Sequence, residues 1–427
     1  MLSYSVPSGM TRRHFMRHMA GASALTGSAL AMGHTLRTHA DELTRNRKSA
    51  ILLWMGGGPS TMDIWDLKPG HRNGGEFRPI STSGDVQICE LMPKMARHMD
   101  KMAIVRSMST READHDRGRY YLHTGYVPNP NIEYPSYGSV IAHELAGQRP
   151  ELEIPPFVAV GGDSVGPGFL GMAWAPFSVS SNGQVRNLDL NMDVNRLTAR
   201  KMALMQLENQ YLQNENRGIA VKEHLDVIDK TFKLMTSPQM SAFKIADEPT
   251  AVREKYGDNG FGNGCLMARR LVETGVPFVE VTLDGWDTHA NNHQGIFPTL
   301  RDKLPEMDQA MGALVEDLDE RGLLQDTVII WMGEFSRTPN INGGAGRDHW
   351  ARSWSTVVGG GGINGGIAVG KTSADGTTVE TEPYSSEDLM ASVCHALGIS
   401  LETTFTSRDG RPMKIANSGR LIKDLFA

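Results

Sequence analysis

The chain has 427 residues, which at about 150 residues per domain leaves room for two to three domains or one large α/β domain with insertions. Its 43 Lys and Arg residues against 49 Asp and Glu give a formal net charge of −6, which excludes the broad positive surface of a nucleic-acid-binding protein. With 40% hydrophobic and 22% charged residues, the composition also excludes a disordered or collagen-like chain. We therefore expect a globular protein with no nucleic-acid partner.

The N-terminus has the pattern of an export signal. Arg12 and Arg13 precede the mildly apolar stretch 19–31, which ends with a small-x-small cleavage site at 29–31. The stretch is too short to span a membrane, because a spanning helix needs about 20 apolar residues. We predict a twin-arginine signal peptide over 1–31, a polar leader over 32–48 and no membrane span. The protein is then exported to the periplasm or the extracellular space.

Short apolar runs typical of buried strands alternate with helical patterns through the rest of the chain. The runs are 50–55, 102–105, 157–160, 278–283 and 327–332, and the clearest helical patterns are 307–318 and 387–397. This alternation predicts an α/β sandwich, in which a mostly parallel central sheet has helices on both faces, within a single domain over 49–427. The segment at about 194–244 has no strand signal, and we interpret it as a helical insertion.

Acidic and histidine residues follow one of these strands directly. Asp284, Asp287 and His289 come after the apolar run 278–282, and ligands of open α/β sheets bind at the carboxyl ends of strands. Carboxylate and imidazole groups a few residues apart on a loop suit zinc, manganese or iron. The alternative is a capped turn with solvated histidines.

Two further groups follow the run 327–332. Glu334 and Arg337 come first, and Arg347, Asp348 and His349 lie in a glycine-rich loop shortly afterwards. An arginine beside a metal cluster suits an anionic substrate, because the guanidinium group matches the oxygens of sulfate, phosphate or carboxylate. Each arginine could equally form a structural salt bridge.

Polar side chains also follow the first two predicted strands. Ser109, Thr110 and His115 come after 102–105, and Asp63 comes after 50–55. A hydroxyl group there could act as a nucleophile if a metal lowered its pKa. Asp63 could equally cap a turn or a helix, which is a common use of Asp after glycine turns.

Two other motif matches lack the context that their chemistry needs. The segment 365–372 matches a phosphate-binding loop, but turn residues follow where a helix should begin. The segment 162–166 around Ser164 matches the nucleophile turn of serine hydrolases, but Pro167 and Gly168 stand where that helix should begin. We interpret the second segment as a binding loop and keep a serine hydrolase only as a minor hypothesis.

Several motifs together resemble one known family. The twin-arginine start and the segments WMGGGPS (54–60), GWDTH (285–289), GEFSRTP (333–339) and GRDHW (346–350) resemble the exported, sulfatase-like family called domain of unknown function fifteen-oh-one. The resemblance covers nearly the whole mature chain. It implies the alkaline-phosphatase-like fold of the sulfatase and alkaline phosphatase superfamily, a divalent metal, and hydrolysis of phosphate or sulfate esters.

The chain departs from the hydrolytic pattern of that superfamily in three places. Glycines 56–58 stand where an acidic ligand follows the first strand, which leaves Asp63 as a displaced candidate, and Glu334-Phe335 stands where Asp-His is usual. The C-x-P-x-R sequence that yields formylglycine is absent after 102–105, so a formylglycine sulfatase is disfavoured. These departures favour a mononuclear or weakened binuclear centre.

The resulting hypothesis is an exported, metal-dependent hydrolase of an anionic small-molecule or glycan ester, with zinc, manganese or calcium as the candidate divalent ion. The expected metal ligands are Asp287, His289, Glu334 and His349, with Asp63, Asp284 and Asp348 as possible additions. The nucleophile would be Ser109, Thr110 or a water held by His115, while Arg337 or Arg347 would steady negative charge. The alternative is a non-catalytic glycan- or anion-binding protein on the same fold.

Overall fold

The computed structural model describes residues 48–183, 193–212, 228–229, 231–289 and 295–426. The predicted signal peptide and leader residues 32–47 lie outside this description. Residues Lys48–Ala427 form one compact unit. No helix among the described residues is long and apolar enough to cross a membrane.

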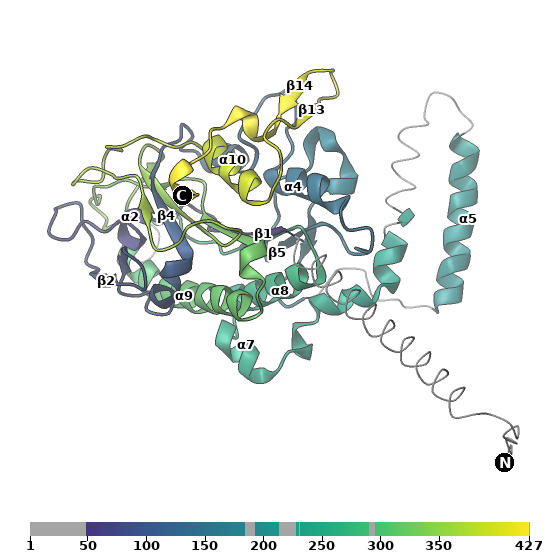
Figure 1. Cartoon of the computed structure of the whole chain (residues 1–427), viewed down its shortest axis with the longest axis horizontal. Helices are drawn as coiled ribbons and strands as arrows, with labels where there is room; N and C mark the ends of the chain where they lie inside the picture. Colours follow the sequence, from purple (N-terminus) through teal and green to yellow (C-terminus); the bar gives the residue numbers. More distant parts are fainter. Residues whose placement is uncertain (1–47, 184–192, 213–227, 230, 290–294, 427) are drawn as a thin grey trace, which may run out of the picture. The chain divides into compact units, whose positions relative to one another are not determined.

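An eight-stranded sheet forms the centre of this unit (Figure 1), in the order β12-β4-β11-β8-β1-β7-β5-β6. Its strands are β1 (Ser49–Trp54), β4 (Met102–Met108), β5 (Phe157–Val160), β6 (Phe177–Val179), β7 (Phe278–Thr282), β8 (Thr327–Met332), β11 (Trp354–Gly359) and β12 (Ala368–Val369). β1 pairs in parallel with β7 and β8, whereas β11 is antiparallel to both β4 and β8. The predicted mostly parallel sheet is therefore confirmed, with β11 as an antiparallel strand that we did not predict.

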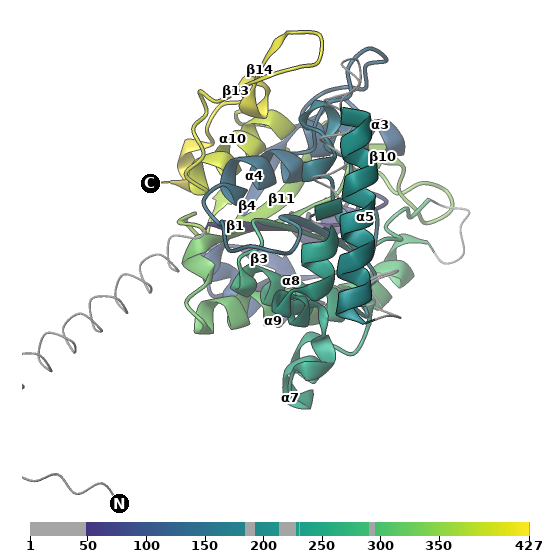
Figure 2. The same cartoon turned by 90° about the vertical axis from the view of Figure 1, so that its right-hand side faces the viewer.

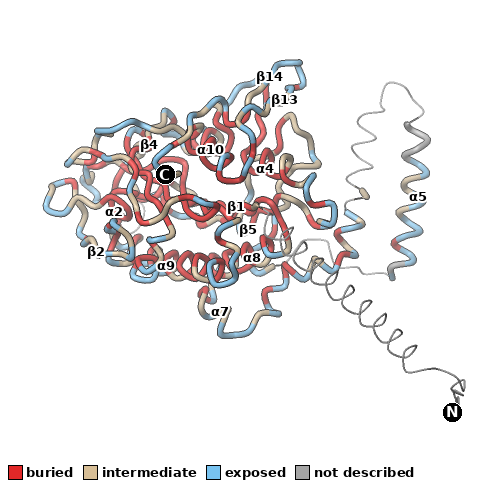
Figure 3. The backbone as a smooth tube through the Cα atoms, in the orientation of Figure 1, coloured by how far each residue is buried: buried red, intermediate tan, exposed pale blue. Residues whose placement is uncertain are grey.

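Helices cover both faces of the sheet, as predicted. Figures 1 and 2 show α8 (Gly260–Thr274) and α9 (Ile296–Glu320) on one face, and α4 (Tyr137–Ala146) and α10 (Ser386–Ala396) on the other. The two faces hold separate apolar clusters, because alternate residues of β1 point to opposite sides: Ile51 and Leu53 to the first cluster, Leu52 and Trp54 to the second. Buried residues accordingly concentrate along the strands and the inner faces of these helices (Figure 3).

Shorter elements lie around this sandwich. The remaining helices with an α label are α2 (Thr61–Ile64), α3 (His115–Thr124), α5 (Val194–Leu212) and α7 (Thr250–Tyr256), and the two-stranded pairs are β2–β3 (Pro79–Ser81, Gln87–Cys89), β9–β10 (Ser336–Arg337, His349–Trp350) and β13–β14 (Thr404–Thr406, Pro412–Lys414). The described part of the predicted insertion contains α5, helical residues at 228–229 and 231–236, and a short 3-10 helix at Pro238–Phe243, with no strand. Residues 213–227 and 230 of that segment lie outside the description.

Candidate metal centre

The candidate site is built where three neighbouring strands end. β1, β7 and β8 run in parallel, and Trp54 lies in register with both Thr282 and Met332. The loops that leave β7 and β8 therefore emerge at one edge of the sheet. After β8, strands β9 and β10 pair in antiparallel fashion, so that His349 lies opposite Arg337.

This geometry brings one carboxylate oxygen and three imidazole nitrogens together. Asp287 Oδ1 lies 3.2 Å from His289 Nε2 and 3.6 Å from His349 Nε2, and these two nitrogens are 2.9 Å apart. His115 Nε2 lies 3.4 Å from the same oxygen. Tetrahedral ligands about 2.0–2.1 Å from a zinc ion would stand about 3.3 Å from one another. The observed spacing is close to that value.

Each of the three imidazoles is held through its other nitrogen. Nδ1 of His115 lies 2.7 Å from Glu334 Oε1, and Nδ1 of His289 lies 2.8 Å from Asp348 Oδ1. Nδ1 of His349 lies 2.7 Å from the carbonyl oxygen of Ala113. Because carboxylate and carbonyl oxygens only accept, each Nδ1 donates its hydrogen and each Nε2 keeps a lone pair. Histidine ligands of metals are oriented by the same kind of partner.

The arrangement fits a cation. Two nitrogen lone pairs facing each other across 2.9 Å repel unless a proton or a metal ion lies between them. His115 Nε2 is buried and has no hydrogen-bond partner. His115, Asp287 and His349 also offer ligand atoms that all lie within 4.8 Å of one another. The donor set, imidazole nitrogen and carboxylate oxygen, is one that zinc accepts.

Arg337 fixes the carboxylate of this cluster. Its guanidinium group is buried, donates to Asp287 Oδ1 at 2.6 Å and also donates to the carbonyl oxygen of Gly58 at 2.7 Å. Burial acts to raise the pKa of Asp287, but the hydrogen bond and charge of Arg337 outweigh it and lower that pKa below its usual value. Asp287 is therefore an anion at neutral pH and is available to a metal ion.

The histidines differ in proton affinity. The hydrogen bond that His115 donates to the Glu334 carboxylate raises the pKa of His115, although burial opposes this effect. Burial lowers the pKa of His349, partly offset by the hydrogen bond to Ala113. His349 is thus suited to act as a neutral ligand, whereas His115 is suited to accept a proton.

We expected Glu334 to be a metal ligand, but its carboxylate does not join the ligand atoms that converge near Asp287. Its Oε1 accepts from His115 and from the backbone N–H of Gly57, at 2.7 and 2.9 Å. Glu334 therefore orients His115 through its Nδ1 and leaves its Nε2 to face Asp287. Asp348 likewise lies behind His289, and its geometry is that of an orienting partner rather than a ligand.

Arg347 and Asp63 pair with each other. Arg347 Nε and Nη2 donate to the two carboxylate oxygens of Asp63, both at 2.9 Å, and both side chains are almost completely buried. A further 2.8 Å bond joins Arg347 to the carbonyl oxygen of Asn73. This geometry corrects the expectation that Arg347 contacts substrate and favours the structural salt bridge; Asp63, bonded in this pair, is not a ligand of the cluster.

The predicted nucleophiles make no hydrogen bond to the cluster in the described structure. The hydroxyl of Thr110 lies 3.4 Å from the carbonyl oxygen of Ala351, and the backbone N–H of Ser109 donates to Tyr384. Ser164 donates to Glu280, whose other oxygen lies 3.1 Å from His123 Nε2. Because the carboxylate stands between serine and histidine, this trio lacks the geometry of a serine hydrolase.

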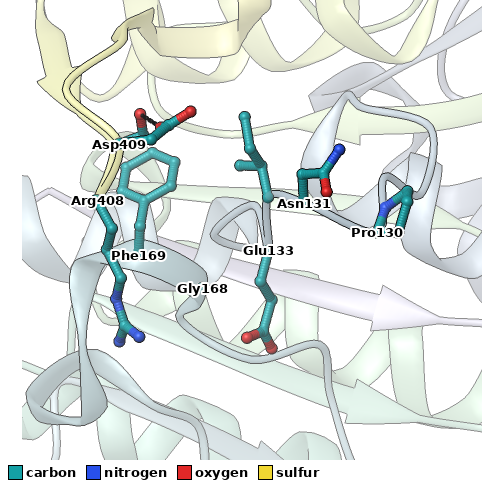
Figure 4. Close-up of a pocket in the computed structure, with 9 residues that line it drawn as sticks. Pro130, Asn131, Glu133, Gly168, Phe169, Arg408 and Asp409 are labelled. Carbon is teal, nitrogen blue, oxygen red and sulfur yellow. Dashed lines mark hydrogen bonds between the residues drawn. The ribbon is translucent and has the colours of Figure 1, made fainter.

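A cavity of about 220 Å³ adjoins the cluster at the ends of β1, β5 and β7. His115, Glu334 and Asp284 line it, and so do Asp116 and Arg119, which were not among the predicted site residues. For Arg119 the signal was its spacing of four residues from His115, since residues i and i+4 share one helix face, whereas Asp116 had no such signal. Another cavity, of about 270 Å³, lies between Glu133, Phe169 and Arg408 and contains none of the predicted site residues (Figure 4).

Comparison with known proteins identifies the family. Residues 47–426 match the family described as "Protein of unknown function (DUF1501)". The chain belongs to this family. The family predicted from the sequence is thus confirmed. No curated protein matches the sequence.

Solved structures of sulfatases and phosphatases are similar to the chain in fold. The PsFucS1 sulfatase from Pseudoalteromonas sp. is 15% identical, with a TM-score of 0.41 over 85% of this chain and 70% of that one. An alkaline phosphatase superfamily protein from Vibrio parahaemolyticus is 11% identical, with a TM-score of 0.39 over 89% and 71%. The alkaline phosphatase of the Antarctic bacterium TAB5 is 14% identical, with a TM-score of 0.32 over 76% and 95%.

Proposed function

We propose that the protein is a metal-dependent hydrolase of phosphate or sulfate esters. The observation that carries this proposal is the convergence of three imidazoles, each fixed at Nδ1, on one oxygen of Asp287. Asp287, His289 and His349 would hold one divalent ion, for which zinc is the first candidate because three nitrogen and oxygen ligands leave a position for substrate or water.

Bound by Asp287, His289 and His349, a divalent ion would supply Lewis-acid chemistry for the oxygens of the ester. His115 Nε2 accepts a proton from the attacking water, whose oxygen forms the new bond to phosphorus or sulfur. The ester bond to the alcohol breaks, and His115 returns the proton to the departing oxygen. Glu334 keeps the imidazole in the tautomer that this transfer needs, and Arg337 holds Asp287 in place.

Hydrolysis of p-nitrophenyl phosphate and p-nitrophenyl sulfate tests this proposal. We expect the zinc-loaded protein to cleave at least one of them, and expect His349→Ala and His115→Ala to lose this activity. His143→Ala is the control, because His143 lies outside the cluster beside Glu144. Absence of cleavage by a folded, zinc-loaded protein, or equal cleavage by His349→Ala, would overturn the proposal in favour of a binding protein without turnover.

We also propose that the protein is exported through the twin-arginine pathway, on the basis of Arg12 and Arg13. Replacing both arginines by lysine keeps the charge of the segment but removes the arginine pair. We expect this variant to accumulate inside the cell, whereas the natural chain is found in the periplasm or the medium. Equal export of the two chains would contradict the proposal.

A further inference from the structure

Two residues that line the cavity beside the cluster each have a buried polar atom that the protein itself does not satisfy. Glu334 is 3% exposed, and its Oε2 has no hydrogen-bond partner although Oε1 has two. Arg119 Nε is also buried without a partner. Both residues line the same cavity, and one atom is an acceptor whereas the other is a donor. Buried polar atoms left in this state are costly unless a ligand or water meets them.

Arg119 is held toward this cavity by its place on α3. It stands one helical turn after His115, so the two side chains leave the same face of the helix. One terminal nitrogen of Arg119 donates to the backbone carbonyl oxygen of Asp163, another residue of the cavity wall. No ion pair involving Arg119 occurs among the described residues, although Asp116, Asp163 and Asp284 all line the cavity.

The chemistry of these groups restricts what can bind. An ammonium group supplies donors only. An anionic group in addition to the phosphate or sulfate of the ester supplies acceptors only, whereas a hydroxyl group supplies both. The carboxylates of Asp116, Asp163, Asp284 and Glu334 outnumber the single guanidinium group of Arg119 and would repel a further negative charge. The volume of about 220 Å³ far exceeds the roughly 10–15 Å³ that one water molecule requires.

We propose that this cavity binds the alcohol part of the ester as an uncharged, polyhydroxylated group of the sugar type, and that Arg119 determines this specificity. The proposal rests on the proposed hydrolase function, because His115 belongs to both the cluster and the cavity wall and so places the ester bond between them. Arg119 donates to a ring or hydroxyl oxygen of the sugar, and Glu334 Oε2 accepts from a neighbouring hydroxyl group.

The test measures direct binding to the mature chain by calorimetry and saturation-transfer NMR. The probes are methyl glycosides of neutral hexoses and the methyl glycoside of glucuronic acid, which adds one carboxylate to an otherwise similar ring. We expect at least one neutral glycoside to bind at least tenfold more tightly than the glucuronide. Arg119→Ala and, independently, Asp116→Asn should each weaken that binding at least tenfold.

Arg117→Ala is the matched control on the same helix, since Arg117 is half exposed and pairs with Glu112 instead of lining the cavity. It should leave sugar binding unchanged. Binding of no glycoside, equal binding of the glucuronide, or unchanged binding by Arg119→Ala and Asp116→Asn would overturn the proposal and leave a cavity that holds water.

Failure of this proposal is distinguishable from failure of the hydrolase function. Cleavage of p-nitrophenyl esters without sugar binding would refute the sugar cavity and leave the hydrolase intact. Sugar binding that depends on Arg119, without metal or cleavage, would refute the hydrolase. With a sugar ester as substrate, Arg119→Ala should raise KM at least tenfold, whereas Arg117→Ala should leave it unchanged.

Discussion

His115 and Glu334 form the pair of side chains on which the proposed proton transfer depends. Glu334 raises the pKa of His115, and only the neutral imidazole can accept a proton. The rate should therefore fall as the pH drops below the pKa of His115. Glu334→Gln keeps the shape of the side chain but removes its charge, so the pKa of His115 falls and the acidic limb of the pH–rate profile moves to lower pH.

The same variant should lower kcat about 10- to 100-fold, which is typical when the partner of a site histidine is lost. Both effects are read from kcat between about pH 5 and 9 with the metal content measured in parallel. An acidic limb that stays in place, or that moves to higher pH, would contradict the role given to Glu334.

The buried pair Arg347–Asp63 should matter for stability. Removing one partner leaves the other charge buried and unpaired, so Arg347→Ala should lower the free energy of unfolding by about 3–5 kcal/mol. Lys371→Ala breaks an exposed pair with Glu380 and should change it by less than about 1 kcal/mol. Urea unfolding measures both, and equal losses would contradict a special role for the buried pair.

The glycine turn that ends β1 lets the chain approach the β7 loop. Gly57 has φ +108°, and a Cβ there would lie 2.6 Å from the backbone nitrogen of Asp287. Gly57→Ala should therefore displace Asp287 and abolish metal binding. Gly70 has a similar φ of +79° with no atom within 4 Å of an added Cβ. Gly70→Ala should cost only the backbone strain, about 1–2 kcal/mol, and retain the metal.

Elemental analysis and thermal unfolding of these two variants distinguish strain from steric displacement. Loss of metal in both variants would show that the loss of folding stability, and not the displacement of Asp287, controls metal binding. Retention in both would mean that the close approach of Gly57 to Asp287 is not required.

Strands and their ends were the part of the architecture that the sequence could predict. The apolar runs at 157–160 and 327–332 coincide with β5 and β8, and the residues that follow β7 reach the cluster. β11 was missed because Ser355 and Thr356 interrupt its apolar run, although both are buried. It is antiparallel to β8 and needs no intervening helix, so the alternation of strands and helices gave no signal for it.

The orientation of side chains within the site depended on packing that the sequence does not reveal. Glu334 turns toward His115 because α3 lies close to the end of β8, where a Cβ on Gly118 would be 3.2 Å from Glu334 Cβ. Arg119 faces the cavity only because of the register of that helix. The i, i+4 spacing places Arg119 on the same face of α3 as His115, but composition and motif spacing do not define the contact of α3 with the end of β8.

The candidate centre joins parts of the chain that are far apart in sequence: the start of α3, the loop after β7 and the β10 strand. A ligand that binds only the folded arrangement stabilises the whole molecule, by about 2.7 kcal/mol at a concentration 100 times its dissociation constant. A metal ion bound at this centre would therefore stabilise the fold as well as serve the proposed chemistry.

The metal content of the protein, purified without chelators and measured by elemental mass spectrometry, tests the central claim most directly. We predict close to one zinc or other divalent ion per chain, lost in His289→Ala and His349→Ala and retained in His115→Ala. A folded natural chain that binds no metal even after zinc loading, or histidine variants that all retain it, would contradict the account.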